Sequence, residues 1–65
     1  MLYRIHAEDG DDLGEAAYGF YVEPGDDILM TIGGRPRRMR VLSLVPVEEE
    51  GSPYEGLLMV NAVND

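Results

Sequence analysis

The chain has 65 residues with thirteen acidic side chains, five arginines, no lysine and no cysteine, which gives a formal net charge of −8. This length allows a single domain, residues 1–65, and the composition excludes disulfides, thiolate-bound metals and lysine Schiff-base chemistry. No apolar run approaches the roughly 18 residues of a membrane span, and no basic stretch followed by an apolar core marks a signal peptide, so we expect a soluble, cytoplasmic protein without a membrane partner.

Two strands are predicted in the first third of the sequence. Residues 2–8 alternate between apolar and polar side chains, which is typical of a half-buried strand. Residues 14–22 form the second predicted strand, because their aromatic side chains favour strands while their two glycines disfavour a helix. A helix over residues 13–20, centred on two alanines, is the alternative.

Three further strands are predicted after the Pro-Gly turn at residues 23–26. Residues 27–32 alternate cleanly, and residues 54–63 are apolar on both sides. Residues 37–47 also alternate and contain a proline, which must lie at an edge, a bulge or the strand's end because it lacks an N–H. Simple alternation assigns the apolar residues of this strand to opposite faces: Met39 and Val41 on one, Leu42 and Leu44 on the other.

Polar turn segments separate these five runs, at residues 9–12, 23–26, 33–36 and 48–53. Strands that are apolar on both faces need cover on both faces, and a small sheet provides it by curling on itself. The sequence therefore predicts an all-β fold: a small five-stranded SH3-like or OB-like barrel, or a strongly bent antiparallel sheet.

A resemblance covers most of the chain. Residues 22–28 read Val-Glu-Pro-Gly-Asp-Asp-Ile, and a glycine-rich turn, an apolar strand over residues 40–47, an acidic loop and a last apolar strand follow. This order resembles a group of small uncharacterised bacterial SH3-like barrel proteins, and the use of arginine without lysine is similar to that of high-GC genomes. The resemblance implies a fold and brings neither catalytic residues nor an activity.

Arginines are concentrated at the third turn and the start of the strand that follows it. Four of the five basic residues fall within six positions: Arg35, Arg37, Arg38 and Arg40. Guanidinium groups bind phosphates or carboxylates with two parallel hydrogen bonds, and small barrels bind single-stranded nucleic acid with a basic groove and aromatic platforms. The tyrosines that could act as platforms are Tyr3, Tyr18, Tyr21 and Tyr54.

Two other interpretations of the arginines compete with nucleic-acid binding. The chain's own carboxylates can pair with them across neighbouring strands, and the net negative charge repels nucleic acid at long range. Internal pairing is therefore favoured over nucleic acid as a partner. The arginines could also dock on an acidic surface, either of a partner protein or of a second copy of the chain.

The remaining polar clusters match no catalytic or metal-binding pattern. Residues 8–12 are acidic, but the sequence lacks the alternating ligands and the final glutamate of an EF-hand loop. His6 is the only histidine and has no serine elbow to activate, and Gly33-Gly34 lacks the lysine and helix of a phosphate-binding loop. We therefore predict no catalytic residue, no metal and no cofactor, and a protein that is not an enzyme.

These observations lead to two functional hypotheses. The first is a non-catalytic protein-interaction module, with self-association as a homodimer as one form, because a small domain without disulfides gains stability from a partner and exposed apolar faces mark partner sites. Its predicted interface consists of four apolar strand residues: Leu42, Leu44, Leu58 and Val60. The alternative is a small barrel that binds single-stranded nucleic acid through Arg35, Arg37, Arg38 and Arg40.

Overall fold

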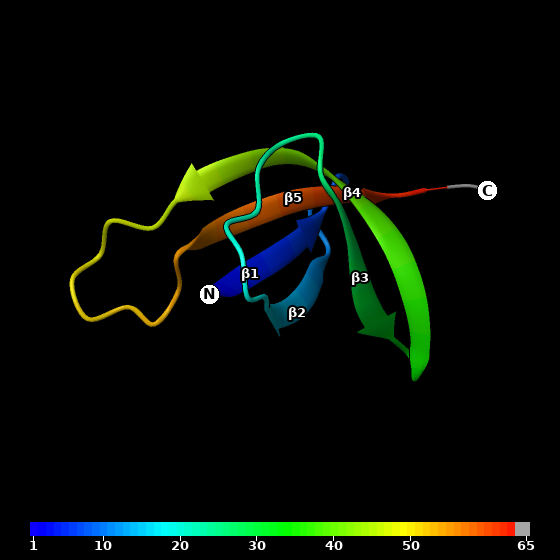
Figure 1. The fold of residues 1–65 in the computed structure, drawn as a ribbon, viewed down its shortest axis with the longest axis horizontal. Helices are drawn as coiled ribbons and strands as arrows, with labels where there is room; N and C mark the ends of the chain where they lie inside the picture. Colours follow the sequence, from blue (N-terminus) through cyan, green and yellow to red (C-terminus); the bar gives the residue numbers. More distant parts are fainter. Residues whose placement is uncertain (64–65) are drawn as a thin grey trace.

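The computed structural model describes residues 1–63 of the chain, which contain five β-strands and no helix (Figure 1). The strands are β1 (Leu2–Ala7), β2 (Asp12–Ala17), β3 (Asp27–Ile32), β4 (Arg35–Pro46) and β5 (Gly56–Ala62). They form one sheet in the order β2-β1-β5-β4-β3. The predicted all-β fold with five strands is therefore confirmed.

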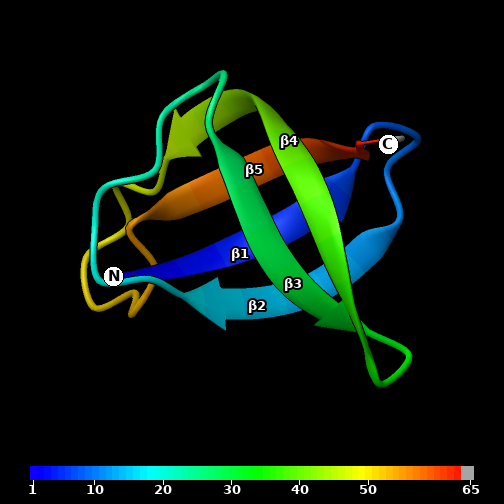
Figure 2. The same cartoon turned by 45° about the vertical axis from the view of Figure 1, so that its right-hand side comes forward.

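The sheet is strongly curled. The first and last strands run in the same direction, so β1 and β5 pair in parallel, whereas the other neighbouring strands pair antiparallel. In Figure 2, β3 and the first half of β4 cross in front of β1 and β2. The result is an open half-barrel, consistent with a small SH3-like or OB-like barrel or a strongly bent sheet.

The core lies on the inner face of this curled sheet. Nine apolar side chains are buried there: Tyr3, Ile5, Val22, Ile28, Met30, Met39, Val41, Leu58 and Val60. Period-two alternation explains their spacing along each strand, since every second side chain points to the same side. The Tyr3 hydroxyl accepts a hydrogen bond of 3.1 Å from the Val22 backbone N–H, which satisfies the one polar atom of that buried ring.

The second strand is shorter than predicted. β2 ends at Ala17, opposite Leu2, and reciprocal backbone hydrogen bonds between Met1 and Tyr18 close the ladder. After Ala17 the chain leaves the sheet, and Val22 packs into the core. The predicted strand over residues 14–22 is therefore wrong in its second half. The alternative helix over residues 13–20 is also wrong, because the backbone there pairs with β1.

β4 contains a β-bulge at Leu42. The ladder with β5 skips one residue between Val41 and Ser43, so Leu42 has no partner on β5. The extra residue reverses the alternation beyond it, which brings Leu44 opposite Leu58 and against the core, while Leu42 stays 42% exposed. The prediction that Leu42 and Leu44 share one face is therefore wrong.

The other strands agree with their predicted positions. β3 occupies the residues predicted for it, and β1, β4 and β5 begin and end within two residues of the prediction. Ile28 and Met30 are buried on one face of β3, as its alternation predicts. β1, β3 and β5 were predictable because each keeps one alternation over its whole length, whereas the extra residues lie in β4 at Leu42 and in β2 at Leu13.

Candidate interaction surfaces

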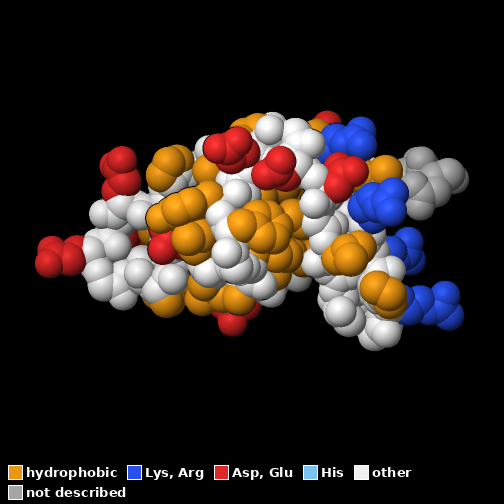
Figure 3. Space-filling model, viewed as in Figure 1, with side chains coloured by type: hydrophobic (Ala, Val, Ile, Leu, Met, Phe, Trp, Pro, Cys, Tyr) orange, Lys and Arg blue, Asp and Glu red, His pale blue; other side chains and the backbone are white. Residues whose placement is uncertain are grey.

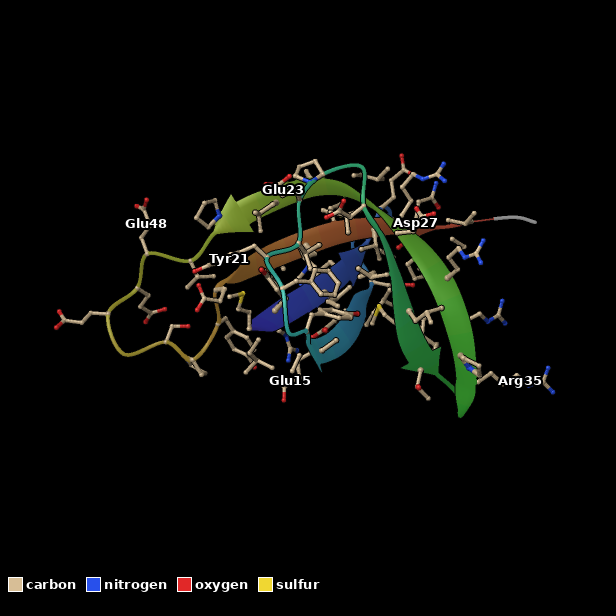
Figure 4. The ribbon with its side chains drawn as sticks, in the orientation of Figure 1. Glu15, Tyr21, Glu23, Asp27, Arg35 and Glu48 are labelled. Carbon is tan, nitrogen blue, oxygen red and sulfur yellow. The ribbon has the colours of Figure 1, made fainter. Side chains whose placement is uncertain are left out.

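The β3–β4 hairpin carries the arginine cluster, with Arg35 beside its tip (Figure 4). Gly33 and Gly34 form its two-residue turn with φ of 60° and 79°, and Ile32 pairs with Arg35 on either side of it. A type I′ turn requires two positive φ angles, which glycine adopts without steric cost. In this register Pro36 falls at a pair that makes no ladder hydrogen bonds, so its missing N–H leaves no gap in the sheet.

Charge is strongly segregated between this hairpin and the rest of the chain. Residues 27–40 contain four arginines and one acid, Asp27, which is a net charge of +3. The remaining residues contain one arginine and twelve acids, which is a net charge of −11. Figure 3 shows the basic side chains gathered at one end of the molecule and the acidic ones spread over the rest of the visible face. The hairpin is therefore a basic arm on an acidic body.

One arginine of the cluster is paired within the hairpin. Arg40 lies directly opposite Asp27, with Nε 3.0 Å and Nη2 3.5 Å from the two carboxylate oxygens. This hydrogen bonding raises the pKa of Arg40. Cross-strand pairing, one of the interpretations of the arginines, therefore holds for Arg40. Within residues 1–63, neither Arg35 nor Arg37 makes an ion pair.

Exposed aromatic side chains lie on the connection that leads into β3. The Tyr18 hydroxyl donates a hydrogen bond of 3.1 Å to the Leu29 carbonyl, and the ring centroids of Tyr18 and Phe20 lie 5.7 Å apart. Phe20, Tyr21 and Leu29 are 50%, 69% and 67% exposed. We call Tyr18, Phe20, Tyr21 and Leu29 the aromatic surface.

Only two of the four tyrosines predicted as stacking platforms belong to the aromatic surface. These are Tyr18 and Tyr21; burial raises the pKa of Tyr18, which keeps its hydroxyl a donor. Tyr3 lies in the core, and the Tyr54 hydroxyl donates to a carboxylate of β2 at 2.5 Å. Phe20 was not predicted, although its place in the aromatic stretch after Ala17 is visible in the sequence.

The outer, convex face of the sheet carries a second exposed apolar surface. Because Leu58 and Val60 fill the inner side of β5, Leu57 and Met59 alternate to the outer side, where they are half-buried. Val45 of β4 lies opposite Leu57 and is 56% exposed. We call the four apolar residues of this side the outer apolar face: Leu42, Val45, Leu57 and Met59.

Polar residues of β1 and β2 border the outer apolar face. Arg4 lies opposite Leu57 and forms an ion pair with Asp12. The backbone N–H of Gly14 donates to the Asp12 carboxylate at 2.8 Å, and this bond, together with Arg4, lowers the pKa of Asp12. His6 lies on the same side, opposite Asp12 on β2. The border is therefore polar but internally paired.

Carboxylates are scarce on the strands themselves. Of the acids in residues 1–63, only three lie on strands, and each has a partner: Asp12 with Arg4, Glu15 with Tyr54, and Asp27 with Arg40. The other described acids lie in turns and connections, such as Glu48 at the far end of the molecule from Arg35 (Figure 4). Most of the carboxylates therefore lie in the turns and connections, not on the outer face of the sheet.

The predicted interface residues do not form one surface. Leu58 and Val60 are 0% exposed, and Leu44 packs against the core because of the bulge. Leu42 alone lies on the outer apolar face. This corrects the predicted interface, because a residue sealed in the core of the folded chain cannot contact a partner. The two-sided apolar pattern of β5 signalled an outer face, but not which side was outer.

No metal-binding arrangement occurs among residues 1–63, where no three His, Asp or Glu side chains lie together. An open depression is lined by Ala7, Glu8, Asp9 and Asn61. Residues 1–63 also include no helix that could serve as a membrane span.

Comparison of the chain with protein families, with curated proteins and with solved structures finds no match. The resemblance to small bacterial SH3-like barrel proteins therefore stays a prediction, and the features of the structure that bear on function are the aromatic surface, the outer apolar face and the β3–β4 hairpin.

Proposed function

We propose that this protein is a non-catalytic, cytoplasmic protein-interaction module that self-associates through its outer apolar face. The observation that carries the proposal is that β5 is apolar on both sides while the chain fully covers only one of them and leaves Leu57 and Met59 half-buried. The inner side is sealed by the curl of the sheet. On the outer side, Leu42 and Val45 remain 42% and 56% exposed, and exposed apolar surface of this kind is stabilised by a partner.

Charge favours a second copy of the chain as that partner. Two molecules that each carry a net charge of −8 repel one another wherever unpaired carboxylates meet. The outer apolar face is bordered by Arg4, His6 and carboxylates that already have partners. It therefore allows close approach at a low electrostatic cost, and a two-fold axis would place the same residues on both sides of the contact.

The size of the face sets the expected affinity. Strands lie about 4.8 Å apart and a six-residue strand is about 20 Å long, so the outer apolar face on β4 and β5, together with its polar border on β1 and β2, gives a footprint of roughly 400 Å². Stable interfaces bury about 800 Å² of surface on each partner. We therefore expect a weak dimer, with a Kd in the range of about 1 to 100 μM.

Analytical ultracentrifugation of matched variants tests the proposal. We expect the weight-average mass to rise from monomer towards dimer over concentrations of about 1 μM to 1 mM. Val45→Glu and Met59→Glu should each weaken dimerisation at least about tenfold. Leu29→Glu is the control, because Leu29 is equally apolar and 67% exposed but lies on the aromatic surface. A monomer at every concentration, or a dimer that only Leu29→Glu disrupts, would contradict the proposal.

A further inference from the structure

The connection between β2 and β3, which the proposed dimer does not use, presents exposed aromatic rings beside carboxylates. Phe20 and Tyr21 are 50% and 69% exposed, and Glu23, two residues further on, is exposed as well. Figure 3 shows acidic side chains beside apolar ones at the middle of the visible face, where Figure 4 labels Tyr21 and Glu23. We call four residues of this connection, two of which belong to the aromatic surface, the connection surface: Phe20, Tyr21, Glu23 and Asp26. We propose that the connection surface binds a short, arginine-containing basic segment of a partner protein.

Hydrogen bonds fix the connection to the rest of the fold. The Val22 backbone N–H donates to the Tyr3 hydroxyl at 3.1 Å, and the Val22 side chain is buried in the core. Further along, the Gly25 N–H donates to the Val41 carbonyl at 2.8 Å, and the Val41 N–H donates to the Asp26 carbonyl at 2.9 Å. The connection is therefore held to the core and to β4, and a ligand does not have to order its backbone on binding.

The side chains on this fixed backbone suit a cationic ligand. Tyr21 and Glu23 flank the buried Val22 and are both exposed, so both side chains point away from the core. The Glu23 backbone N–H donates to the Asp26 carboxylate at 2.9 Å, which brings a second carboxylate to the same turn. Within residues 1–63, neither Glu23 nor Asp26 forms an ion pair. The connection surface therefore offers two carboxylates and two rings to a ligand.

A guanidinium group matches both halves of the connection surface. Its flat face stacks on an aromatic ring, and its edge presents parallel N–H groups that bind a carboxylate. An ammonium group lacks both the flat face and the fork of donors, so lysine makes fewer of these contacts. The residues outside the β3–β4 hairpin carry a net charge of −11, which attracts a basic segment and repels an acidic one.

The number of contacts sets a modest affinity. A cation over an exposed ring strengthens binding by a factor of about 2 to 5, and an exposed ion pair contributes no more than that. We therefore expect a Kd of about 10 μM to 1 mM for a segment that contacts two rings and two carboxylates. Because these charges are exposed to solvent, the affinity should fall as the salt concentration rises.

Fluorescence anisotropy of a labelled peptide of alternating arginine and glycine, about eight residues long, tests the proposal. In low salt we expect saturable binding. A peptide with citrulline in place of arginine has nearly the same shape without the charge and should bind at least about tenfold more weakly; a lysine peptide should bind at least about threefold more weakly. Tyr21→Leu should weaken binding of the arginine peptide about two- to fivefold, whereas Tyr21→Phe keeps the ring and should retain it.

A charge-matched control separates local contact from net charge. Glu23→Gln and Asp11→Asn each remove one negative charge. Asp11 lies between β1 and β2, and β4, β5 and β1 separate it along the sheet from Asp26. We expect only Glu23→Gln to weaken binding, by about twofold or more.

Three results would overturn the proposal: equal losses in Glu23→Gln and Asp11→Asn, equal binding of the arginine and lysine peptides, or no binding in low salt. The dimer-disrupting Met59→Glu variant should bind the arginine peptide at least as tightly as the wild type, because Met59 lies on the outer apolar face. This proposal and the proposed self-association can therefore fail separately.

Discussion

Leu44 of β4 lies directly opposite Leu58 of β5, on the core side of the sheet, although Leu42, two residues earlier, points to the outer side and is 42% exposed. The bulge at Leu42 creates this relationship. It gives β4 one phase before the bulge and the opposite phase after it, so Met39, Val41 and Leu44 all reach the core, while Leu42 and Val45 lie on the outer apolar face.

The bulge makes Leu44 and Leu42 unequal in their contribution to stability. We expect Leu44→Ala to lower the free energy of unfolding by about 1 to 2 kcal/mol, because part of its side chain is removed from contact with the core. Leu42→Ala should change it by less than about 0.5 kcal/mol in the monomer. Urea unfolding at low protein concentration checks both values. Equal losses would show that the phase does not reverse at Leu42.

A tight contact beside this pair gives a second prediction. A Cβ added at Gly56 would lie 2.7 Å from the Leu44 Cδ1 and 3.0 Å from the Val45 carbonyl oxygen. We expect Gly56→Ala to cost about 1 to 3 kcal/mol in unfolding free energy through overpacking. Gly19→Ala is the matched control, because its Cβ would meet no atom within 4 Å. Thermal unfolding that ranks the two variants in the opposite order would contradict the packing of β4 on β5.

The Asp12 carboxylate should give the protein a specific acid sensitivity. Its pKa is lowered from 3.8 by the Gly14 backbone N–H and by Arg4, so its ionised form stabilises the fold. This contribution to stability is present above pH 3.8, the ordinary pKa of the group. It is lost as the pH falls from there through the lower pKa that Asp12 has in the folded protein. We expect the difference in Tm between the wild type and Asp12→Asn to shrink in this window. A difference that is constant from pH 7 to about pH 2 would contradict this role of the charge.

Tyr18 protects the edge strand β3. Its hydroxyl occupies the Leu29 carbonyl, which points away from β4 at an open sheet edge. We expect Tyr18→Phe to lower the free energy of unfolding by about 0.5 to 1.5 kcal/mol. Amide hydrogen exchange should speed up in β3 more than in β1. Unchanged exchange in β3 would show that the hydroxyl does not hold this edge.

Much of this fold follows from local patterns in the sequence. The alternation of residues 27–32 predicts a strand whose buried face is the one observed, and the Gly33-Gly34 pair marks the hairpin turn. The bulge could not be predicted in this way, because it depends on which residue of β5 meets which residue of β4 and not on periodicity. The same limit explains the interface: Leu58 and Leu57 are equally apolar, and only the curl of the sheet decides which side is inside.

The position of the arginine cluster was predictable from the sequence, but its ion pairing was not. Its position at a turn and strand start was predictable from spacing alone. That Arg40 pairs with Asp27 could be deduced only from the register of the hairpin, which sets the two residues opposite each other. The exposure of Phe20 and Tyr21 likewise depends on the path of the 18–26 connection, which buries Val22 in the core.

The most direct test of the central claim is an isotope-filtered NMR experiment on a mixture of ¹³C-labelled and unlabelled protein at high concentration. If two copies meet through the outer apolar face, methyl groups of Leu42, Val45, Leu57 and Met59 will show intermolecular NOEs, and Leu29 will show none. Intermolecular NOEs from Leu29 without any from Met59, or their complete absence in a sample that sediments as a dimer, would contradict the account.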